Sequence, residues 1–516
     1  MEGDFDFSAK LEELASSSMR FSYKVKPEID YEQEYRDIYS AFGVPASDIE
    51  DFIDNWELSK IKAQRFYKRN PNCLLIHDIL DELHADLIGS DTRNPDLISY
   101  DITVVIFVVL LATICNCNDD AEIAEFWFFN NMELQHLIPG MPSPKHMISD
   151  ETVRTIRKLV SEDVMHAIFK KYFDRVKFHV ADMVMNKQYD SQNYRKTLGG
   201  DGQELRATFR EGCFSRKRKG GHVVSIYDCD EQRAVGYKTV HKKNQEVQAF
   251  IDILDKIEVD RNIIFYADAL NLRDVLINYL NKKYIDWLFP VKNNAGNKEL
   301  RKSIAKAFGE IKDPDKVFTR HTIEKISGRI EETTYSMMGA ENLPEEIMNK
   351  YGKLCTIIKV EKTTTTYNAR NTNPSEQPKG TTRVHYYISS LEGVFENFRQ
   401  LVHSISVRWY FEVQHNTLDC FFLQDSQALC NEDNIKATVG KNKIAYNLVA
   451  YARQRLSVDG YRHTRFRTES SAKRKPLSFK QTRQALACDI YLAFRIMIDF
   501  LVDEYNDADI VKSEEV

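Results

Sequence analysis

The chain has 516 residues, of which 43% are hydrophobic and 29% charged, and its formal net charge at pH 7 is −6. This composition is that of a globular protein with a packed core, and at roughly 150 residues per domain the length allows two to four domains. The nine cysteines include no CxxC pair, which argues against a zinc site and a disulfide scaffold and favours a reducing compartment.

The first third of the chain is predicted to be largely helical. Residues 1–75 are expected to form an acidic, partly helical extension, because residues 1–60 hold fifteen Asp and Glu against six Lys and Arg. A helical domain is expected at 76–175. Its most apolar run, residues 102–115, is shorter than the ~20 residues that cross a bilayer, so it predicts a buried helix and no membrane partner. The acidic N-terminus also lacks the basic-then-apolar pattern of a signal peptide.

The pattern changes to alternating strands and helices after about residue 195. Strands are predicted at 222–227, 234–240, 262–267 and 284–291, and helices at 246–257 and 272–281. A strand hairpin followed by helix, strand, helix and strand predicts an α/β fold around a mixed sheet. We expect residues 190–309 to form the first part of this domain, residues 310–392 a β-rich insertion, and residues 393–500 the second part of the domain. An acidic tail is expected at 501–516.

The later part of the chain combines β-type runs, a helix and basic segments. Residues 355–360 and 384–389 read as strands, and a helix is predicted from about 395 past Glu412. Residues 453–483 hold ten Lys and Arg against two acids, and Arg216-Lys-Arg-Lys219 is a second basic run. Both would attract phosphates without regard to sequence. A solvated surface and a nuclear-import signal are the alternatives that the sequence leaves open.

Three acidic residues stand at positions that suit catalysis. Asp268 follows a buried strand, where α/β sheets tend to place ligands, although a helix cap would explain it as well. Asp201 lies in a Gly-Gly-Asp-Gly sequence that is ordinarily a turn. Glu412 lies on a helix one turn after Arg408, an arrangement typical of a surface ion pair. Taken together, one carboxylate from each of three elements could converge on two divalent cations, which prefer oxygen ligands.

Ten short motifs stand one after another between about Asp91 and Met497, and three of them contain these acids. They are Asp201-Gly-Gln-Glu-Leu-Arg206, Tyr266-Ala-Asp268-Ala269 and Arg408-Trp-x-x-Glu412. The others are Asp91-Thr-Arg93, Ile148-Ser-Asp-Glu-Thr152, Gly221-His-Val-Val-Ser225, Lys242-Lys-Asn-Gln-Glu246, Lys292-Asn-Asn294, Gly328-Arg-Ile-Glu331 and Tyr386-Tyr-Ile-Ser-Ser390. In this order they resemble the H-repeat-associated insertion-sequence transposases, a branch of the DDE transposases. Gln203 and Val413 depart from the family pattern, which has Lys and Asn there, and residues 1–75 have no counterpart.

The resemblance implies a ribonuclease-H-like catalytic domain with a β-rich insertion, preceded by an all-helical N-terminal region. It implies that Asp201, Asp268 and Glu412 are catalytic and hold Mg²⁺ or Mn²⁺, two ions in all. The activity implied is metal-dependent cleavage of double-stranded DNA at transposon terminal inverted repeats and strand transfer into target DNA, by a homodimer. The helical domain is the candidate for binding the DNA ends. Candidate DNA contacts are Lys242, Lys243, Lys292, Arg329 and Arg408.

Two other interpretations are open. A domesticated protein could keep the fold and bind DNA without cutting it. A stand-alone nuclease of the ribonuclease H type could share the acids, but it would have no use for the long β insertion between Asp268 and Glu412. Localisation is expected to follow the host, in the cytoplasm and nucleoid of a prokaryote or the nucleus of a eukaryote.

Overall fold

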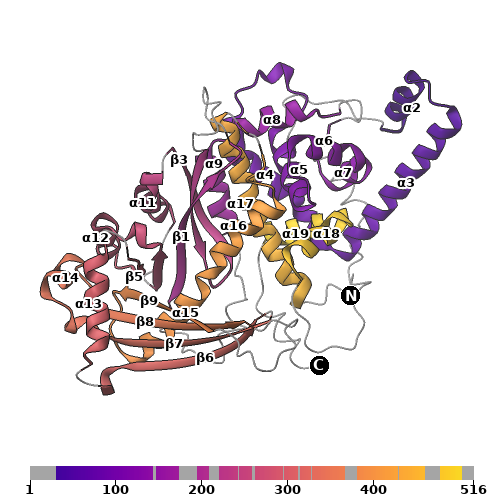
Figure 1. Cartoon of the computed structure of the whole chain (residues 1–516). Coiled ribbons are helices and arrows are strands. Elements are labelled where there is room, and N and C mark those ends of the chain that lie inside the picture. The colour runs from indigo at the N-terminus through magenta and orange to yellow at the C-terminus, as the bar shows by residue number, and fades with distance from the viewer. Residues whose placement is uncertain are drawn as a thin grey trace, which may run out of the picture. The chain divides into compact units, whose positions relative to one another are not determined.

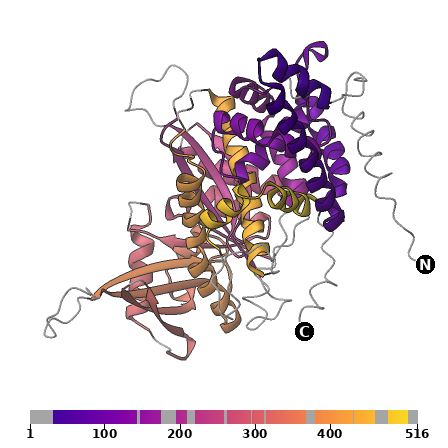
Figure 2. The ribbon, with the colours of Figure 1, turned by 90° about the vertical axis from the view of Figure 1, so that its right-hand side faces the viewer.

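The computed structural model describes residues 31–142, 147–173, 195–208, 220–241, 243–257, 262–293, 296–311, 314–326, 328–366, 380–427, 429, 431–458 and 477–502. The chain divides into two compact units. The helical unit takes the described parts of Met1–Phe178, Glu204–Gly221 and His415–Val516. The sheet unit takes those of His179–Gln203 and His222–Gln414. Figures 1 and 2 show the elements of both units.

In the helical unit, helices pack around the apolar helix α5. Every residue of α5 (Ile102–Ile114) is buried, which confirms the buried helix predicted there. No helix of the described residues is long and apolar enough to cross a membrane. The helices before and after α5 in the chain are α2 (Tyr31–Ala41), α3 (Ala46–Arg69), α4 (Ile76–Leu87), α6 (Asp120–Phe129), α7 (Asn131–Leu137), α8 (Asp150–Leu159), α9 (Glu162–Phe173), α17 (Glu432–Val458), α18 (Phe479–Ala487) and α19 (Ile490–Val502).

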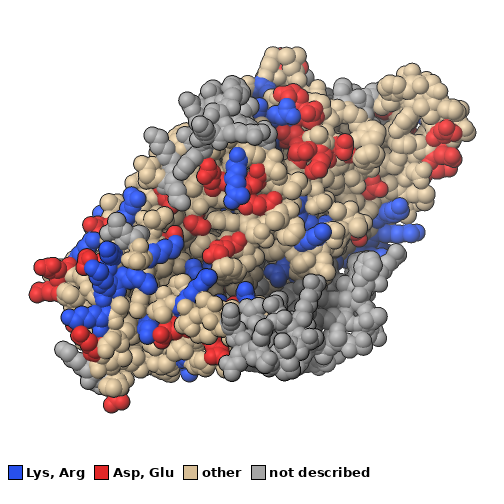
Figure 3. Space-filling model, viewed as in Figure 1, with Lys and Arg blue, Asp and Glu red and all other residues tan. Residues whose placement is uncertain are grey.

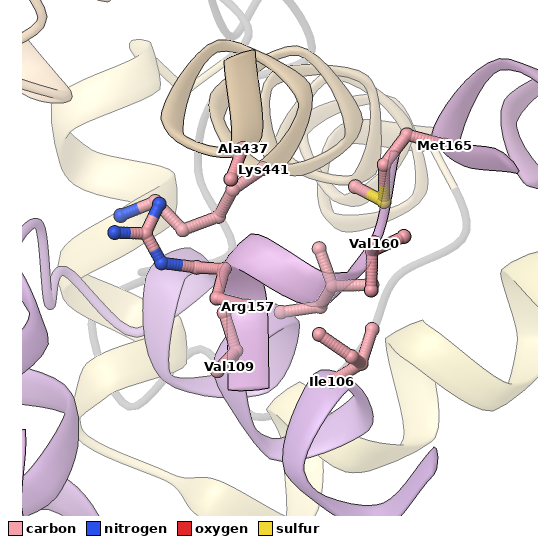
Figure 4. A pocket seen from close by; sticks show the side chains of 8 residues that line it. Ile106, Val109, Arg157, Val160, Met165, Ala437 and Lys441 are labelled. Carbon is pink, nitrogen blue, oxygen red and sulfur yellow. The ribbon is translucent and has the colours of Figure 1, made fainter. Parts of the chain in front are cut away.

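Buried cations lie on α8 and α17. The Arg157 guanidinium pairs with Asp120 at 2.9 Å and donates to Asn434 and Thr438. Figure 4 shows Arg157 beside a cavity of ≈ 10 Å³, which holds about one water molecule and is too small for a substrate. Further along α17, Lys443 is fully buried, and its ammonium has no hydrogen-bond partner among the residues that the structure describes. Burial lowers the pKa of Lys443 to about 7.

The sheet unit is built on a nine-stranded mixed sheet, which confirms the predicted α/β class. The strand order is β3-β2-β1-β4-β5-β9-β8-β7-β6. β1 pairs with β4 and β4 with β5 in parallel, whereas β2/β3, β5/β9, β6/β7, β7/β8 and β8/β9 are antiparallel. The strands are β1 (Lys196–Leu205), β2 (Gly221–Asp228), β3 (Arg233–Val240), β4 (Ile263–Ala267), β5 (Asp286–Val291), β6 (Phe318–Ile326), β7 (Arg329–Gly339), β8 (Thr356–Thr366) and β9 (Gly380–Ser389).

Helices cover both faces of the central strands. On one face α11 (Glu246–Lys256) and α12 (Asp274–Lys282) pack on apolar side chains such as Leu198 and Phe265. On the other face lie α15 (Phe395–Val407) and α16 (Trp409–Phe421), whose residues contact β1 and β4. Burial on both faces explains why β4 is a continuous apolar run. The remaining helices of the unit are α13 (Lys298–Gly309) and α14 (Glu345–Lys350).

The strands of the predicted insertion continue the central sheet and do not form a sheet of their own. β9 returns to pair with β5, and β8, β7 and β6 follow outward in a meander (Figure 1). The outermost strand, β6, has no fully buried residue. The insertion is therefore continuous with the strand that neighbours β4.

Candidate active site

Two of the predicted acids lie side by side on adjacent parallel strands. The ladder between β1 and β4 pairs Gly199 with Tyr266 and Gly200 with Ala267. One residue further along both strands stand Asp201 and Asp268, and Asp268 keeps an extended backbone (φ −65°, ψ 156°). Neighbouring strands lie about 4.8 Å apart, so the two carboxylates leave the sheet next to each other. Asp201 lies inside β1, and the prediction that it follows a turn was wrong.

The helix that carries Glu412 packs on the face from which these carboxylates project. Side chains alternate along a strand, so Gly199 shares a face with Asp201 and Tyr266 shares it with Asp268. The Phe411 ring covers this face: a Cβ on Gly199 would lie 2.7 Å from Phe411 Cδ1, and the ring centroids of Phe411 and Tyr266 are 6.2 Å apart. A glycine is required at 199 because the ring fills the space of a side chain.

Arg408 joins Glu412 to β4. It is the single residue between α15 and α16, and its Nη1 donates to the Tyr266 hydroxyl at 3.3 Å. The same nitrogen lies 4.0 Å from Glu412 Oε1. Burial alone lowers the pKa of Arg408, but the neighbouring tyrosines and Glu412 raise it above its ordinary value, so the guanidinium stays charged. Sequence reasoning missed Tyr266, although its place two residues before Asp268 puts it on the same face.

Lys292 neutralises Asp268. It follows the end of β5, the parallel strand on the other side of β4, and its Nζ lies 2.6 Å from Asp268 Oδ1. Both side chains are partly exposed. The ammonium therefore stands where a cation bound to Asp268 would compete with it.

The acids suit divalent cations in chemistry without forming a closed ligand set. Among the described residues, no group of three His, Cys, Asp or Glu side chains lies close enough together to hold a metal ion. The carboxylates of Asp201, Asp268 and Glu412 are nevertheless of the chemical type that binds such ions, and the Glu412 side chain is 44% exposed. Hard cations such as Mg²⁺ take oxygen ligands and keep several waters, so an open site of this kind fits them.

Of the other predicted DNA contacts, Arg329 is the one whose side chain the structure describes, and it lies far from this face. Lys242 lies outside the described residues, and Lys243 opens the 3-10 helix that precedes α11. Arg329 stands at the hairpin between β6 and β7 and pairs with Glu331 at 2.8 Å. Across the sheet, the pairing runs from Val291 at the end of β5 through β9 and β8 to Ser336 of β7. Arg329 lies seven residues from Ser336 along β7, which is about 23 Å at ~3.3 Å per residue.

Comparisons with known proteins agree with the resemblance read from the motifs. Residues 190–384 match a family model described as Transposase DDE domain. The putative transposase YncI of Escherichia coli O157:H7 is 21% identical over 378 residues, 70% of this chain and 84% of the relative. The H repeat-associated putative transposase YhhI of Escherichia coli (strain K12) is 23% identical over 283 residues, 53% of this chain and 69% of the relative. The similarity to H-repeat-associated transposases is thus confirmed.

A third relative and one solved structure complete the comparison. The putative protein YbfL of Escherichia coli (strain K12) is 24% identical over 282 residues, 53% of this chain and 69% of the relative. A cryo-EM structure of the piggyBac transposase synaptic complex with hairpin DNA covers 85% of this chain and 82% of its own, at a TM-score of 0.37 and 10% identity. That score is too low to establish a shared fold. The matched region 190–384 includes Asp201 and Asp268 and ends before Glu412.

Proposed function

We propose that this relative of the H-repeat-associated transposases is a DDE transposase that cleaves DNA at transposon ends and transfers the freed strand to target DNA. The observation that carries the proposal is the register of β1 and β4, which sets Asp201 and Asp268 side by side within the region that matches a transposase DDE domain. The packing of Phe411 on the same face supports its neighbour Glu412 as the third acid of the proposal. The mixed sheet of the unit supports a ribonuclease-H-like catalytic domain.

Asp201 and Asp268 would hold one Mg²⁺ or Mn²⁺ ion, and Glu412 with Asp201 would hold a second. When bound, such a pair of ions activates the attacking water and stabilises the attacking and leaving oxygens. Lys292 pairs with Asp268 in the ion-free protein. Once a divalent cation neutralises Asp268, the Lys292 ammonium would be able to bind the phosphate of the DNA. Arg408, held by Tyr266, presents its remaining N–H groups to the DNA backbone.

The chemistry proposed has two steps at one site. In the first, water attacks the phosphorus at the transposon end and the P–O3′ bond breaks, which leaves a 3′-hydroxyl. In the second, that hydroxyl attacks a phosphorus of target DNA, and a target P–O3′ bond breaks as the new one forms. The proposal includes a homodimer that pairs two ends, in the nucleoid or the nucleus according to the host.

Exposed lysines on the sheet unit support a nucleic-acid partner. Figure 3 shows Lys and Arg side chains gathered where Figure 1 labels α12, α13 and α14. Exposed residues of these helices and of the segments next to them include Lys282, Lys283, Lys298, Lys302, Lys306, Lys350 and Lys353. Each phosphate that a lysine neutralises releases counterions, so binding through this surface would weaken steeply as salt is raised.

The test is cleavage of a DNA fragment that carries the inverted repeats flanking the gene. Wild type, Asp268→Asn and Asp286→Asn are compared, each with Mg²⁺ and with EDTA. Asp286 is the matched control, because it lies at the start of β5 and pairs with Arg195 at 2.9 Å. We expect nicking at the repeat ends in wild type and in Asp286→Asn, and none in Asp268→Asn or in EDTA. Equal nicking by Asp268→Asn would overturn the proposal.

A DNA-binding protein that no longer cuts is the second candidate. The observation in its favour is the open ligand set, with Asp268 already paired with Lys292. Specific binding of the repeats by wild type, with no nicking in Mg²⁺ or Mn²⁺, would select this alternative.

A further inference from the structure

A buried polar network lies directly beneath the two aspartates. Glu246 is the first residue of α11, and its carboxylate uses both oxygens: Oε1 lies 3.0 Å from His222 Nε2, and Oε2 accepts from Asn271 Nδ2 at 3.1 Å. The three residues are 5%, 6% and 4% exposed. They come from the start of β2, the start of α11 and the 3-10 helix that follows β4 (Ala269–Asn271).

The network touches the chain immediately after each aspartate. Gly202 follows Asp201, and a Cβ built there would lie 2.4 Å from His222 Nε2 and 2.5 Å from Glu246 Oε1. Asn271 lies three residues after Asp268, and its backbone N–H donates to the Asp268 carbonyl at 2.8 Å. One carboxylate therefore connects β1 next to Asp201 with the segment that follows Asp268 at the end of β4.

The network supports the aspartates from behind and does not share their face. Side chains alternate along β1, so position 202 projects opposite to Asp201 and toward α11. A buried carboxylate is costly unless it is hydrogen-bonded, and Glu246 is further stabilised at the first turn of its helix by the helix dipole. Loss of this group would remove the hydrogen bonds of Glu246 to His222 and Asn271, and the backbone next to Asp201 and Asp268 would be free to shift.

We propose that Glu246, with His222 and Asn271, is the positioning element that sets the separation of Asp201 and Asp268 for divalent-cation binding. The inference rests on the proposed function. Glu246 is not a ligand in this scheme; it acts through the backbone of Gly202 and of the segment after Asp268. Residues that orient ligands from behind usually contribute about 10–100-fold to metal affinity.

The test is Mn²⁺ binding to the full-length protein without DNA, measured by electron paramagnetic resonance. We expect Glu246→Ala to weaken Mn²⁺ binding by about 10–100-fold, and Glu246→Gln, which keeps the shape and one acceptor, to recover much of the loss. His403→Gln is the matched control. It breaks another largely buried His–carboxylate pair, to Asp230 at 2.6 Å, whose other oxygen accepts from Thr197 near the opposite end of β1. Its Mn²⁺ affinity should stay at the wild-type value.

The outcomes separate this inference from the function on which it rests. If the wild-type protein shows no Mn²⁺ binding that is lost in Asp268→Asn, the proposed function fails, and the inference fails with it. If wild type binds and Glu246→Ala binds equally well, or if His403→Gln weakens binding as much as Glu246→Ala, only the positioning role is refuted. Should Glu246→Ala fail to fold, Asn271→Ala removes a single hydrogen bond, and wild-type Mn²⁺ affinity in that variant would refute the role equally.

Discussion

The substitution Gly199→Ala should reduce DNA cleavage by more than its effect on stability explains. The Cβ of Gly199→Ala would stand 2.7 Å from Phe411 Cδ1 and 3.0 Å from Cys229 Sγ. Carbon atoms pack at about 3.5–4.0 Å, so the Phe411 ring must move by about 1 Å. Such overpacking costs about 1–3 kcal/mol of unfolding free energy. Because Glu412 is the next residue on α16, the same movement displaces the third acid, and a 1 Å misplacement costs about 100-fold in rate.

Gly200→Ala is the matched control for this experiment. Its Cβ would lie 2.8 Å from Phe250 Cε1 and 2.8 Å from Phe265 Cζ, on the opposite face of the same strand. Urea unfolding should report a similar loss of about 1–3 kcal/mol for both variants. Nicking of repeat-end DNA in saturating Mg²⁺ should fall about 100-fold in Gly199→Ala alone. Equal loss of nicking in both variants, or full nicking by a destabilised Gly199→Ala, would refute the role assigned to the packing of α16.

Three further changes have defined outcomes. Lys292→Ala should raise Mn²⁺ affinity of the DNA-free protein by at most about fivefold, since a partly exposed ion pair contributes ~0.2–1 kcal/mol; an unchanged titration would mean that Lys292 does not compete at Asp268. Arg408→Lys should slow nicking about 10–100-fold and lower the free energy of unfolding by up to ~1.5–3 kcal/mol, because it removes a charged hydrogen bond of fixed geometry to Tyr266; a wild-type rate of nicking would exclude Arg408 from the site. The pKa of Lys443 is lowered to about 7 in the folded protein, from an ordinary value of 10.5. Between these two pH values Lys443 binds fewer protons in the folded state than in the unfolded state. The free energy of unfolding of the wild-type protein should therefore rise with pH in this range. Lys443→Met should be more stable than wild type at pH 7, and its free energy of unfolding should rise less steeply with pH, by up to about 1.4 kcal/mol per pH unit. Calorimetry at several pH values measures this slope, and a slope equal to that of wild type would contradict the prediction.

The sequence predicts elements well where the local pattern and the burial coincide. β4 and α5 are continuous apolar runs in the sequence and are buried on all sides in the structure. The helix predicted from about 395 past Glu412 is instead two helices, and the break falls at Arg408. No helix-breaking residue marks that position, and Arg408 itself keeps a helical backbone (φ −51°, ψ −29°).

The candidate site depends on contacts that no local pattern encodes. The two glycines before Asp201 suggest a turn, yet they lie in a strand because aromatic rings from α11 and α16 occupy the space of their side chains. Glu246 stood in a recognisable motif, but its partners His222 and Asn271 come from 24 and 25 residues away. The acids themselves could be selected by their order along the chain, whereas their shared face required the register of β1 with β4.

The place of β9 beside β5 sets an order for folding. Leu288 pairs with Ser389, about 100 residues later, whereas β6, β7, β8 and β9 pair with strands that are their neighbours in sequence. At ~5–20 residues per second of synthesis, β5 leaves the ribosome roughly 5–20 s before its partner does. During that interval β5 is an edge strand with a row of backbone groups that have no strand partner. The meander can form first and dock as one piece, so the nascent chain closes the loop of about 100 residues between β5 and β9 in one step, at the strand next to β4.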